Sequence, residues 1–335
     1  LTEFKTLLSM SLPITLQFAG ELLAYAAINI MSRNVTQTCQ RLISALARFE
    51  EVQGIIEGFD KDFSAEAEIA NNTKITPIHI PLASGKIDFQ DVTFSYPNSA
   101  RLVLDSMNLS IQPGEKIVLT GQPSSGKTTV LRLIQGLFTP TSGVVTLDGF
   151  RSSLIDEADR SQIMGVGHQK TSLFSGSLLD NITLGRSNLT DQQIWDVIYL
   201  LKLDKFINQL PLGFDTPIQN ISHLLNNDLL ARVILSRALV HRPTVLLIDN
   251  LFDAIHPEVQ AAFVSQYLQA NADITAVFVS QYLPLHQQVN KIAVIQNGAI
   301  TESGHFNTLV QRQGAYYYLH VIDRTFKAHA ANAAL

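Results

Sequence analysis

The residues best suited to do chemistry lie in the stretch 121–129, with the sequence GQPSSGKTT, between two apolar segments. The spacing fits the P-loop pattern G-x-x-x-x-G-K-[ST], in which backbone N–H groups and the positive end of the following helix bind phosphate oxygens. Glycines let the backbone approach phosphate because they carry no Cβ. We expect Lys127 to contact the outer phosphates and the Thr128 hydroxyl to hold Mg²⁺. The predicted nucleotide-binding residues of this stretch are Gly121, Ser124, Ser125, Gly126, Lys127, Thr128 and Thr129.

An acid at the end of an apolar run is the second feature with chemical meaning. Residues 244–248 read TVLLI and are followed by Asp249. A short run of this composition predicts a buried strand. A carboxylate at the end of such a strand, far along the chain from Lys127, is suited to reach Mg²⁺ through water.

The elements that position these residues follow from the hydrophobic spacing. The P-loop pattern itself requires a strand before Gly121 and a helix after Lys127, and the chain has apolar segments on both sides. Further predicted strands cover 86–94, 104–111, 143–147, 275–280 and 291–295, and helical spacing covers 191–201 and 227–240. Strands alternating with helices predict an α/β fold with a mostly parallel, helix-covered sheet, and the first strands predict an antiparallel addition.

Composition narrows the class of protein. The 335 residues suffice for one large or two modest domains. Charged residues make up 16% of the chain, below the roughly 25% of soluble domains, and hydrophobic residues make up 46%, which favours a membrane-proximal or heavily buried part. A net charge of −5 argues against nucleic-acid binding as the main function, and the single cysteine, Cys39, excludes an intramolecular disulfide.

The first part of the chain is expected to be membrane-derived. From 7 to 31 the only ionisable residue is Glu21, over a length that matches a bilayer crossing. Scattered polar residues favour a span that faces other helices, and an apolar soluble helix is the alternative. The chain starts at Leu1 without a charged n-region or cleavage site, so no signal peptide is predicted and the sequence fits a piece of a longer protein. The predicted divisions are a membrane-span remnant with a helical extension at 1–58, a linker at 59–84, a nucleotide-binding domain at 85–320 and a tail at 321–335.

With these motifs in order, the chain resembles the ATP-binding cassette (ABC) transporter family, in particular exporters whose membrane domain and cassette share one chain. The resemblance runs from about 85 to 320. It implies that Tyr96 stacks on adenine, and that Gln169 senses Mg²⁺ and the attacking water. Other residues in register with the family are Leu173-Phe174-Ser175-Gly176, Arg232, Pro243 and His305.

Several departures from the family pattern affect catalysis. Asn250 stands where the family has a glutamate that polarises water, and Gln281 replaces the histidine that contacts the γ-phosphate. The family signature Leu-Ser-Gly-Gly-Gln falls on 225–229, which reads LNNDL. There Asp228 is expected to add a negative charge that opposes closure over phosphate, by about 4 kcal/mol at 4 Å and an effective dielectric near 20. His256 replaces an aspartate of the dimer-contact loop.

The resemblance implies an α/β P-loop cassette with an antiparallel β subdomain and a helical subdomain at about 169–240, preceded by a membrane-derived helical segment. The implied cofactors are ATP and Mg²⁺, with Thr128, Gln169 and Asp249 around the metal and no intact catalytic residue, since Asn250 and Gln281 occupy those positions. The implied partners are a second cassette, in a homodimer or, as we favour, a heterodimer, and membrane-spanning helices, with the cassette on the cytosolic side. The expected function is ATP binding with weak or no hydrolysis. The alternatives are an active transport ATPase that uses replacement groups, or a scaffold or regulatory component in which ATP is structural.

Overall fold

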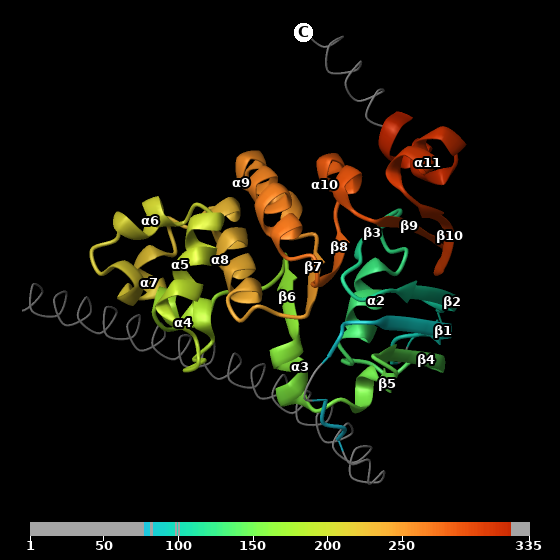
Figure 1. Ribbon diagram of the computed structural model, residues 1–335, viewed down its shortest axis with the longest axis horizontal. Coiled ribbons are helices and arrows are strands. Elements are labelled where there is room, and N and C mark those ends of the chain that lie inside the picture. Colours follow the sequence, from blue (N-terminus) through green and yellow to red (C-terminus); the bar gives the residue numbers. More distant parts are fainter. Residues whose placement is uncertain (1–76, 81–82, 98, 100, 323–335) are drawn as a thin grey trace, which may run out of the picture. The chain divides into compact units, whose positions relative to one another are not determined.

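The computed structural model describes residues 77–80, 83–97, 99 and 101–322 (Figure 1). The predicted membrane-span remnant at 1–58, much of the predicted linker and the end of the tail lie outside these residues. Among the helices that the structure describes, none combines the length and the hydropathy needed to cross a bilayer.

A six-stranded sheet with the order β10-β9-β3-β8-β7-β6 forms the centre of the domain. All neighbouring pairs are parallel except β10 with β9. The strands are β3 (Lys116–Thr120), β6 (Met164–His168), β7 (Val245–Asp249), β8 (Thr275–Val279), β9 (Lys291–Gln296) and β10 (Ala299–Gly304). The predicted mostly parallel sheet is confirmed, and its parallel strands bring their carboxyl ends to one edge.

The antiparallel addition is a second sheet with the order β2-β1-β4-β5. Its strands are β1 (Ile87–Phe94), β2 (Leu104–Ile111), β4 (Ser142–Leu147) and β5 (Phe150–Arg151). The apolar residues of β1 and β2 are buried, as the sequence pattern predicted, and their alternation with exposed residues is interrupted once in each strand, where the β1–β2 register shifts.

Helices surround the central sheet. Those from α4 to α8 gather on one side of it in Figure 1, opposite the antiparallel sheet, and correspond to the predicted helical subdomain. Capping boxes at Ser177 and Thr190 begin α4 and α5. The helices are α2 (Lys127–Ile134), α3 (Glu157–Ile163), α4 (Leu178–Thr183), α5 (Asp191–Leu200), α6 (Asp204–Asn208), α7 (Ile218–Ile221), α8 (Asn227–Leu239), α9 (Pro257–Ala262), α10 (Leu283–Gln288), α11 (Phe306–Arg312) and α12 (Ala315–Tyr317). Two π-helical turns, Phe263–Leu268 and Tyr318–Ile322, extend α9 and α12.

Two hydrophobic cores cover the two faces of the central sheet. In β7, Leu246 and Ile248 join the core shared with the helical subdomain, whereas Val245 and Leu247 join the core shared with the antiparallel sheet. This alternation follows from the period of two along a strand. Because both faces are covered, β7 is apolar throughout until the buried carboxylate of Asp249.

His241, just after α8, makes the stability of the domain depend on pH. Burial, assisted by the nearby charge of Arg186, lowers the pKa of its imidazole from 6.5 to about 4, although Nε2 lies 3.2 Å from the Met164 carbonyl oxygen. The unfolded chain therefore binds more protons between these values. The contribution of neutral His241 to the free energy of unfolding is complete above about pH 6.5. It is lost as the pH falls, and the free energy of unfolding is lower by about 2 kcal/mol at about pH 5.

We expect urea unfolding to detect this loss as a steeper acid dependence in the wild-type chain than in His241→Gln. The exposed His223 offers a matched control, because His223→Gln should keep the wild-type dependence. Equal pH dependence in His241→Gln and wild type would contradict the assignment.

Candidate functional site

The loop 121–126, which the sequence pattern predicts to bind phosphate, connects the end of β3 to the start of α2. Gly121 has φ 145° and Gly126 has φ 104°, conformations that L-residues rarely adopt. A Cβ on Gly121 would lie 2.1 Å from the Ile295 carbonyl oxygen, and one on Gly126 would lie 2.7 Å from Cδ2 of Leu104. Both glycines are therefore required by backbone conformation and by close packing.

Lys127 lies over this loop. Its Nζ donates to the carbonyl oxygens of Gly121, at 3.0 Å, and Gln122, at 2.7 Å, and to Ser125 Oγ at 3.1 Å. Burial lowers the pKa of the ammonium, and the negative charge of Asp249 opposes that shift. The ammonium thus sits in a concave set of oxygen acceptors, where a phosphate oxygen would compete for the same three protons.

Asp249 ends β7 directly beside His168, which ends β6, because the two residues are register partners. The Asp249 side chain is 4% exposed, and its Oδ1 accepts a hydrogen bond of 3.0 Å from Asn250 Nδ2. Among the described residues its Oδ2 has no hydrogen-bond donor, and it lies 3.2 Å from His168 Nε2, outside hydrogen-bond geometry. A buried carboxylate oxygen with an open acceptor position fits Mg²⁺, which prefers oxygen ligands.

His168 is the functional neighbour that the sequence analysis missed. Its Nδ1 accepts a hydrogen bond of 3.2 Å from the Lys170 backbone N–H, so the proton of the neutral ring lies on Nε2, which faces Asp249. The available signal was its position next to Gln169. Gln169 itself is exposed, and its backbone N–H donates to the Asp249 carbonyl oxygen at 3.1 Å. The structure therefore brings these two residues to Asp249, and Thr128 lies in the first turn of α2, next to Lys127.

Tyr96 lies beside the P-loop helix and is half-buried. Its hydroxyl is 2.9 Å from Thr129 Oγ1 and accepts a hydrogen bond of 3.2 Å from Arg132. Its ring meets Phe94 and Phe138 edge to face, with centroids 5.0 and 5.4 Å apart. These contacts place an aromatic ring next to the loop, and its stacking on adenine stays a prediction.

If the Tyr96 ring stacks on the base, its removal should matter more than the removal of its hydroxyl. We expect Tyr96→Ala to weaken ATP binding about tenfold, the effect of one lost stacking contact, and to weaken GTP binding to a similar extent. Tyr96→Phe keeps the ring and should bind ATP within about twofold of wild type. Equal losses in both variants, measured by titration with a fluorescent nucleotide, would instead assign the effect to the hydroxyl.

Asn250 and Gln281 lie in loops whose backbones are held by hydrogen bonds. Asn250 has φ 53° and its backbone N–H donates to the Val279 carbonyl oxygen at 2.9 Å. The Gln281 backbone N–H donates to the Asp253 carboxylate, at 2.9 Å to Oδ2, and the Ser280 hydroxyl bonds the same group. The segment after β7 is thus bonded to β8 through Asn250, and the segment after β8 is bonded to Asp253.

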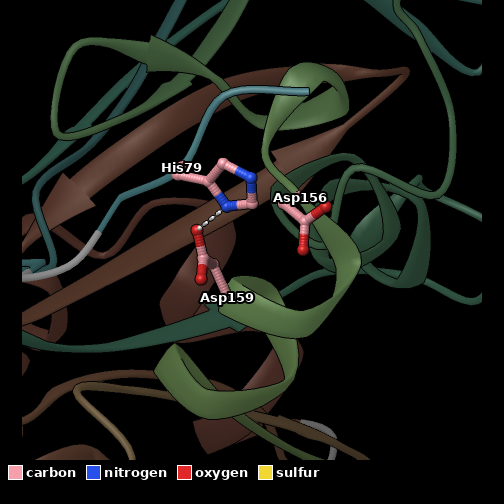
Figure 2. A group of neighbouring side chains, drawn as sticks. All are labelled: His79, Asp156 and Asp159. Atoms are coloured by element: carbon pink, nitrogen blue, oxygen red, sulfur yellow. Dashed lines mark hydrogen bonds and ion pairs between the residues drawn. The ribbon is translucent and has the colours of Figure 1, made fainter. Parts of the chain in front are cut away.

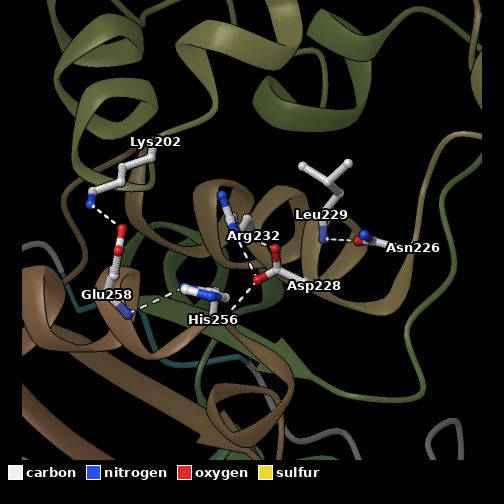
Figure 3. A network of polar contacts seen from close by, with 7 residues as sticks. All are labelled: Lys202, Asn226, Asp228, Leu229, Arg232, His256 and Glu258. Carbon is white, nitrogen blue, oxygen red and sulfur yellow. Dashed lines mark hydrogen bonds and ion pairs between the residues drawn. The ribbon is translucent and has the colours of Figure 1, made fainter.

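At Asp228, where the sequence predicts an added negative charge, the structure shows a paired carboxylate. Its carboxylate forms a two-pronged ion pair with Arg232 and accepts a hydrogen bond of 2.7 Å from the His256 backbone N–H (Figure 3). The carboxylate therefore joins the first turn of α8 to the segment before α9. Asn226 caps α8 by accepting from the Leu229 N–H at 2.8 Å, in the place of the family's signature serine.

A group of three potential metal ligands elsewhere in the described residues has a structural explanation. His79, Asp156 and Asp159 lie together (Figure 2), but Asp159 Oδ2 accepts the Ile80 N–H at 2.8 Å, and Asp156 caps α3. His79 lies 3.2 Å from Asp159 and is 75% exposed. These contacts anchor Ile80, which falls within the predicted linker and whose side chain is buried in the core, so the group attaches this segment to the domain.

Comparisons with known proteins show which family the chain is similar to. Residues 104–253 match the family model described as ABC transporter. The chain is 30% identical over 295 residues to the mitochondrial potassium channel ATP-binding subunit of Rattus norvegicus, covering 84% of this chain and 40% of that protein. It is also 30% identical over 270 residues to a Staphylococcus aureus protein named for multidrug export, an ATP-binding/permease protein, covering 80% of this chain and 46% of the relative.

The fold is similar to that of a bacterial Atm1-family ABC exporter solved with ATP bound. The TM-score is 0.66 at 23% identity, over 76% of this chain and 46% of that one. The chain spans less than half the length of the curated relatives it matches.

Proposed function

The chain carries an ABC transporter domain of the exporter type, and on that premise we propose that it binds Mg-ATP and hydrolyses it slowly or not at all. The observation that carries the proposal is that the features for binding and those for hydrolysis differ at the same edge of the sheet. The P-loop has the required glycine conformations and a lysine held over it, whereas Asn250 stands beside Asp249.

In this proposal the P-loop backbone and Lys127 hold the phosphates, and Tyr96 supports the base. Thr128, Gln169 and Asp249 would hold Mg²⁺, which when bound neutralises charge that develops on the phosphates. Asn250 donates a hydrogen bond of 3.0 Å to the Asp249 carboxylate and helps to orient it, and His168 Nε2 lies 3.2 Å from the other oxygen.

Hydrolysis is expected to be weak because Asn250, which follows Asp249, has no carboxylate to take the proton of an attacking water. The Asn250 amide nitrogen already donates to Asp249, and an amide has no basic site. Loss of a positioned general base typically lowers the rate by about 10²–10⁴-fold. Gln281 can donate a hydrogen bond to phosphate but has no cationic form.

The proposed setting is a membrane assembly in which this cassette pairs with a second one. The S. aureus relative is named for export and as a permease, which supports membrane-spanning partners. A cytosolic position of the cassette is part of the proposal. We favour a heterodimer. In a homodimer each composite site would carry both Asn250 and the altered 225–229 segment, whereas in a heterodimer each site would carry only one of these two defects.

ATP titration of the purified 335-residue chain, with and without Mg²⁺, tests the binding claim, and steady-state phosphate release tests the catalytic one. We expect saturable, Mg²⁺-dependent binding together with turnover at least about 100-fold below that of an exporter cassette with the glutamate. Turnover at the rate of such a cassette would refute impaired hydrolysis, and no ATP binding would refute the proposal.

A scaffold or regulatory role with structural ATP is the second candidate, and the name of the rat relative as a channel's ATP-binding subunit favours it. The two candidates differ in nucleotide exchange. A nucleotide that stays bound through purification and exchanges slowly would favour the scaffold, whereas rapid exchange during transport would favour the exporter.

A further inference from the structure

Three buried side chains near the end of the described chain connect it to both sides of the candidate nucleotide site. His286 lies on α10, Tyr316 on α12 and His320 on the π-helical turn that follows. All are at most 5% exposed. We call these three residues the C-terminal clasp.

One arm of the clasp leads to the end of β8. His286 Nε2 lies 3.0 Å from the Ser280 carbonyl oxygen, which can only accept, so Nε2 carries a proton. In the neutral ring Nδ1 is then the acceptor for the Tyr316 hydroxyl, 2.8 Å away. Ser280 directly precedes Gln281, so this arm reaches the segment that faces the γ-phosphate in the proposed function.

The other arm leads to the end of β3. His320 Nε2 is 2.6 Å from Thr120 Oγ1, and Thr120 is 4% exposed. Thr120 directly precedes Gly121, the first residue of the P-loop. The His320 ring also packs on Tyr316, with centroids 4.9 Å apart, and on His286, at 5.1 Å, so the two arms share one packed centre.

The segment that carries Tyr316 and His320 is itself fixed to the sheet. The Glu302 carboxylate on β10 accepts from the backbone N–H groups of Ala315, at 2.6 Å, and Tyr316, at 3.1 Å. A side chain on Gly314 would lie 2.0 Å from Glu302 Oε1, so the chain approaches the carboxylate closely at this point. The clasp is therefore held from the edge strand rather than only by its contacts with β3 and β8.

We infer that the C-terminal clasp is a positioning element for the nucleotide site: it holds the ends of β3 and β8, and through them the start of the P-loop and the Gln281 segment. The inference rests on the proposed nucleotide binding. None of the three clasp side chains is placed on the nucleotide. They act through Thr120 and Ser280. The P-loop has little room to absorb a shift of β3, because Gly121 already packs tightly against the Ile295 carbonyl oxygen.

Single-atom changes in the full chain can test this inference. Thr120→Val removes the hydroxyl that meets His320 at nearly constant volume, and Thr120→Ser retains it. Tyr316→Phe removes the hydroxyl that meets His286. Its matched control is Tyr318→Phe on the next turn, since Tyr318 is 62% exposed. We expect Thr120→Val and Tyr316→Phe to weaken ATP binding about three- to tenfold, while both controls remain near wild type.

Hydrogen exchange of the nucleotide-free chain supplies a second measurement that does not depend on ATP. Amide hydrogen exchange should become faster in residues 117–129 of Thr120→Val and in residues 279–283 of Tyr316→Phe. The increase should be larger there than in the other strands. Unchanged ATP binding and exchange in a folded Thr120→Val chain would overturn the inference and leave the proposed function standing. Absence of ATP binding by the wild type would overturn both. If Tyr316→Phe does not fold, the comparison of Thr120→Val with Thr120→Ser alone tests the inference.

Discussion

Replacing Lys127 by alanine should weaken ATP binding about 100-fold, the largest single loss we expect in this chain. Hydrogen bonds to charged groups are worth about 1.5–3 kcal/mol each, and the Lys127 ammonium is the cation held directly over the loop. The variant also leaves the Gly121 and Gln122 carbonyl oxygens without this donor. Isothermal titration with Mg-ATP measures the change.

Lys205→Ala is the matched control for this experiment. Lys205 lies exposed on α6, in the helical subdomain, so the variant removes the same charge from the whole molecule without touching the P-loop. We expect its ATP affinity to stay within about twofold of wild type at moderate salt, where exposed charges are screened. Tight ATP binding by Lys127→Ala would show that the loop is not the nucleotide site.

The second large effect is expected in the opposite direction: Asn250→Glu should raise ATP turnover, by about tenfold or more. A carboxylate at this position can accept a proton from water, and a general base contributes about 10²–10⁴-fold when well positioned. The gain is expected at the lower end of this range or below it, because Gln281 and the altered 225–229 segment remain. Steady-state phosphate release at saturating Mg-ATP measures it.

Asn250→Gln is the control that separates the effect of a general base from the other effects of Asn250→Glu. Asn250 has φ 53°, a conformation that asparagine tolerates better than most residues, so glutamate and glutamine carry a similar backbone cost. Both also displace the amide that donates to Asp249. Glutamine lacks a basic oxygen, and we expect no increase in turnover. Equal turnover in the two variants would mean that a missing base is not what limits hydrolysis.

The negative charge of Asp228 does not by itself explain weak catalysis, because other residues of the fold pair with its carboxylate. The residue type alone predicts repulsion of phosphate. In the fold, Arg232 one turn along α8 neutralises the carboxylate, and the His256 N–H takes another of its acceptor positions. An Asp228→Gly change toward the family pattern would therefore remove a bridge between α8 and the segment before α9.

The sequence by itself determined the elements and most of the candidate site, because these depend on local spacing. Apolar runs predicted the strands that end at Thr120 and Asp249, and the glycine and lysine spacing between 121 and 129 predicted the P-loop. Parallel strands necessarily gather their carboxyl ends, so the proximity of Lys127 and Asp249 also followed from pattern alone.

Only the tertiary structure decided the contacts between residues far apart in the chain. Nothing local to His168 shows that β6 lies next to β7, and so that its imidazole faces Asp249 at 3.2 Å. The pairing of His320 with Thr120 spans 200 positions, and no periodic pattern encodes it. The physical reason is that hydrophobic spacing specifies which face of an element is buried, whereas the partner of a buried polar atom is set by how the elements pack.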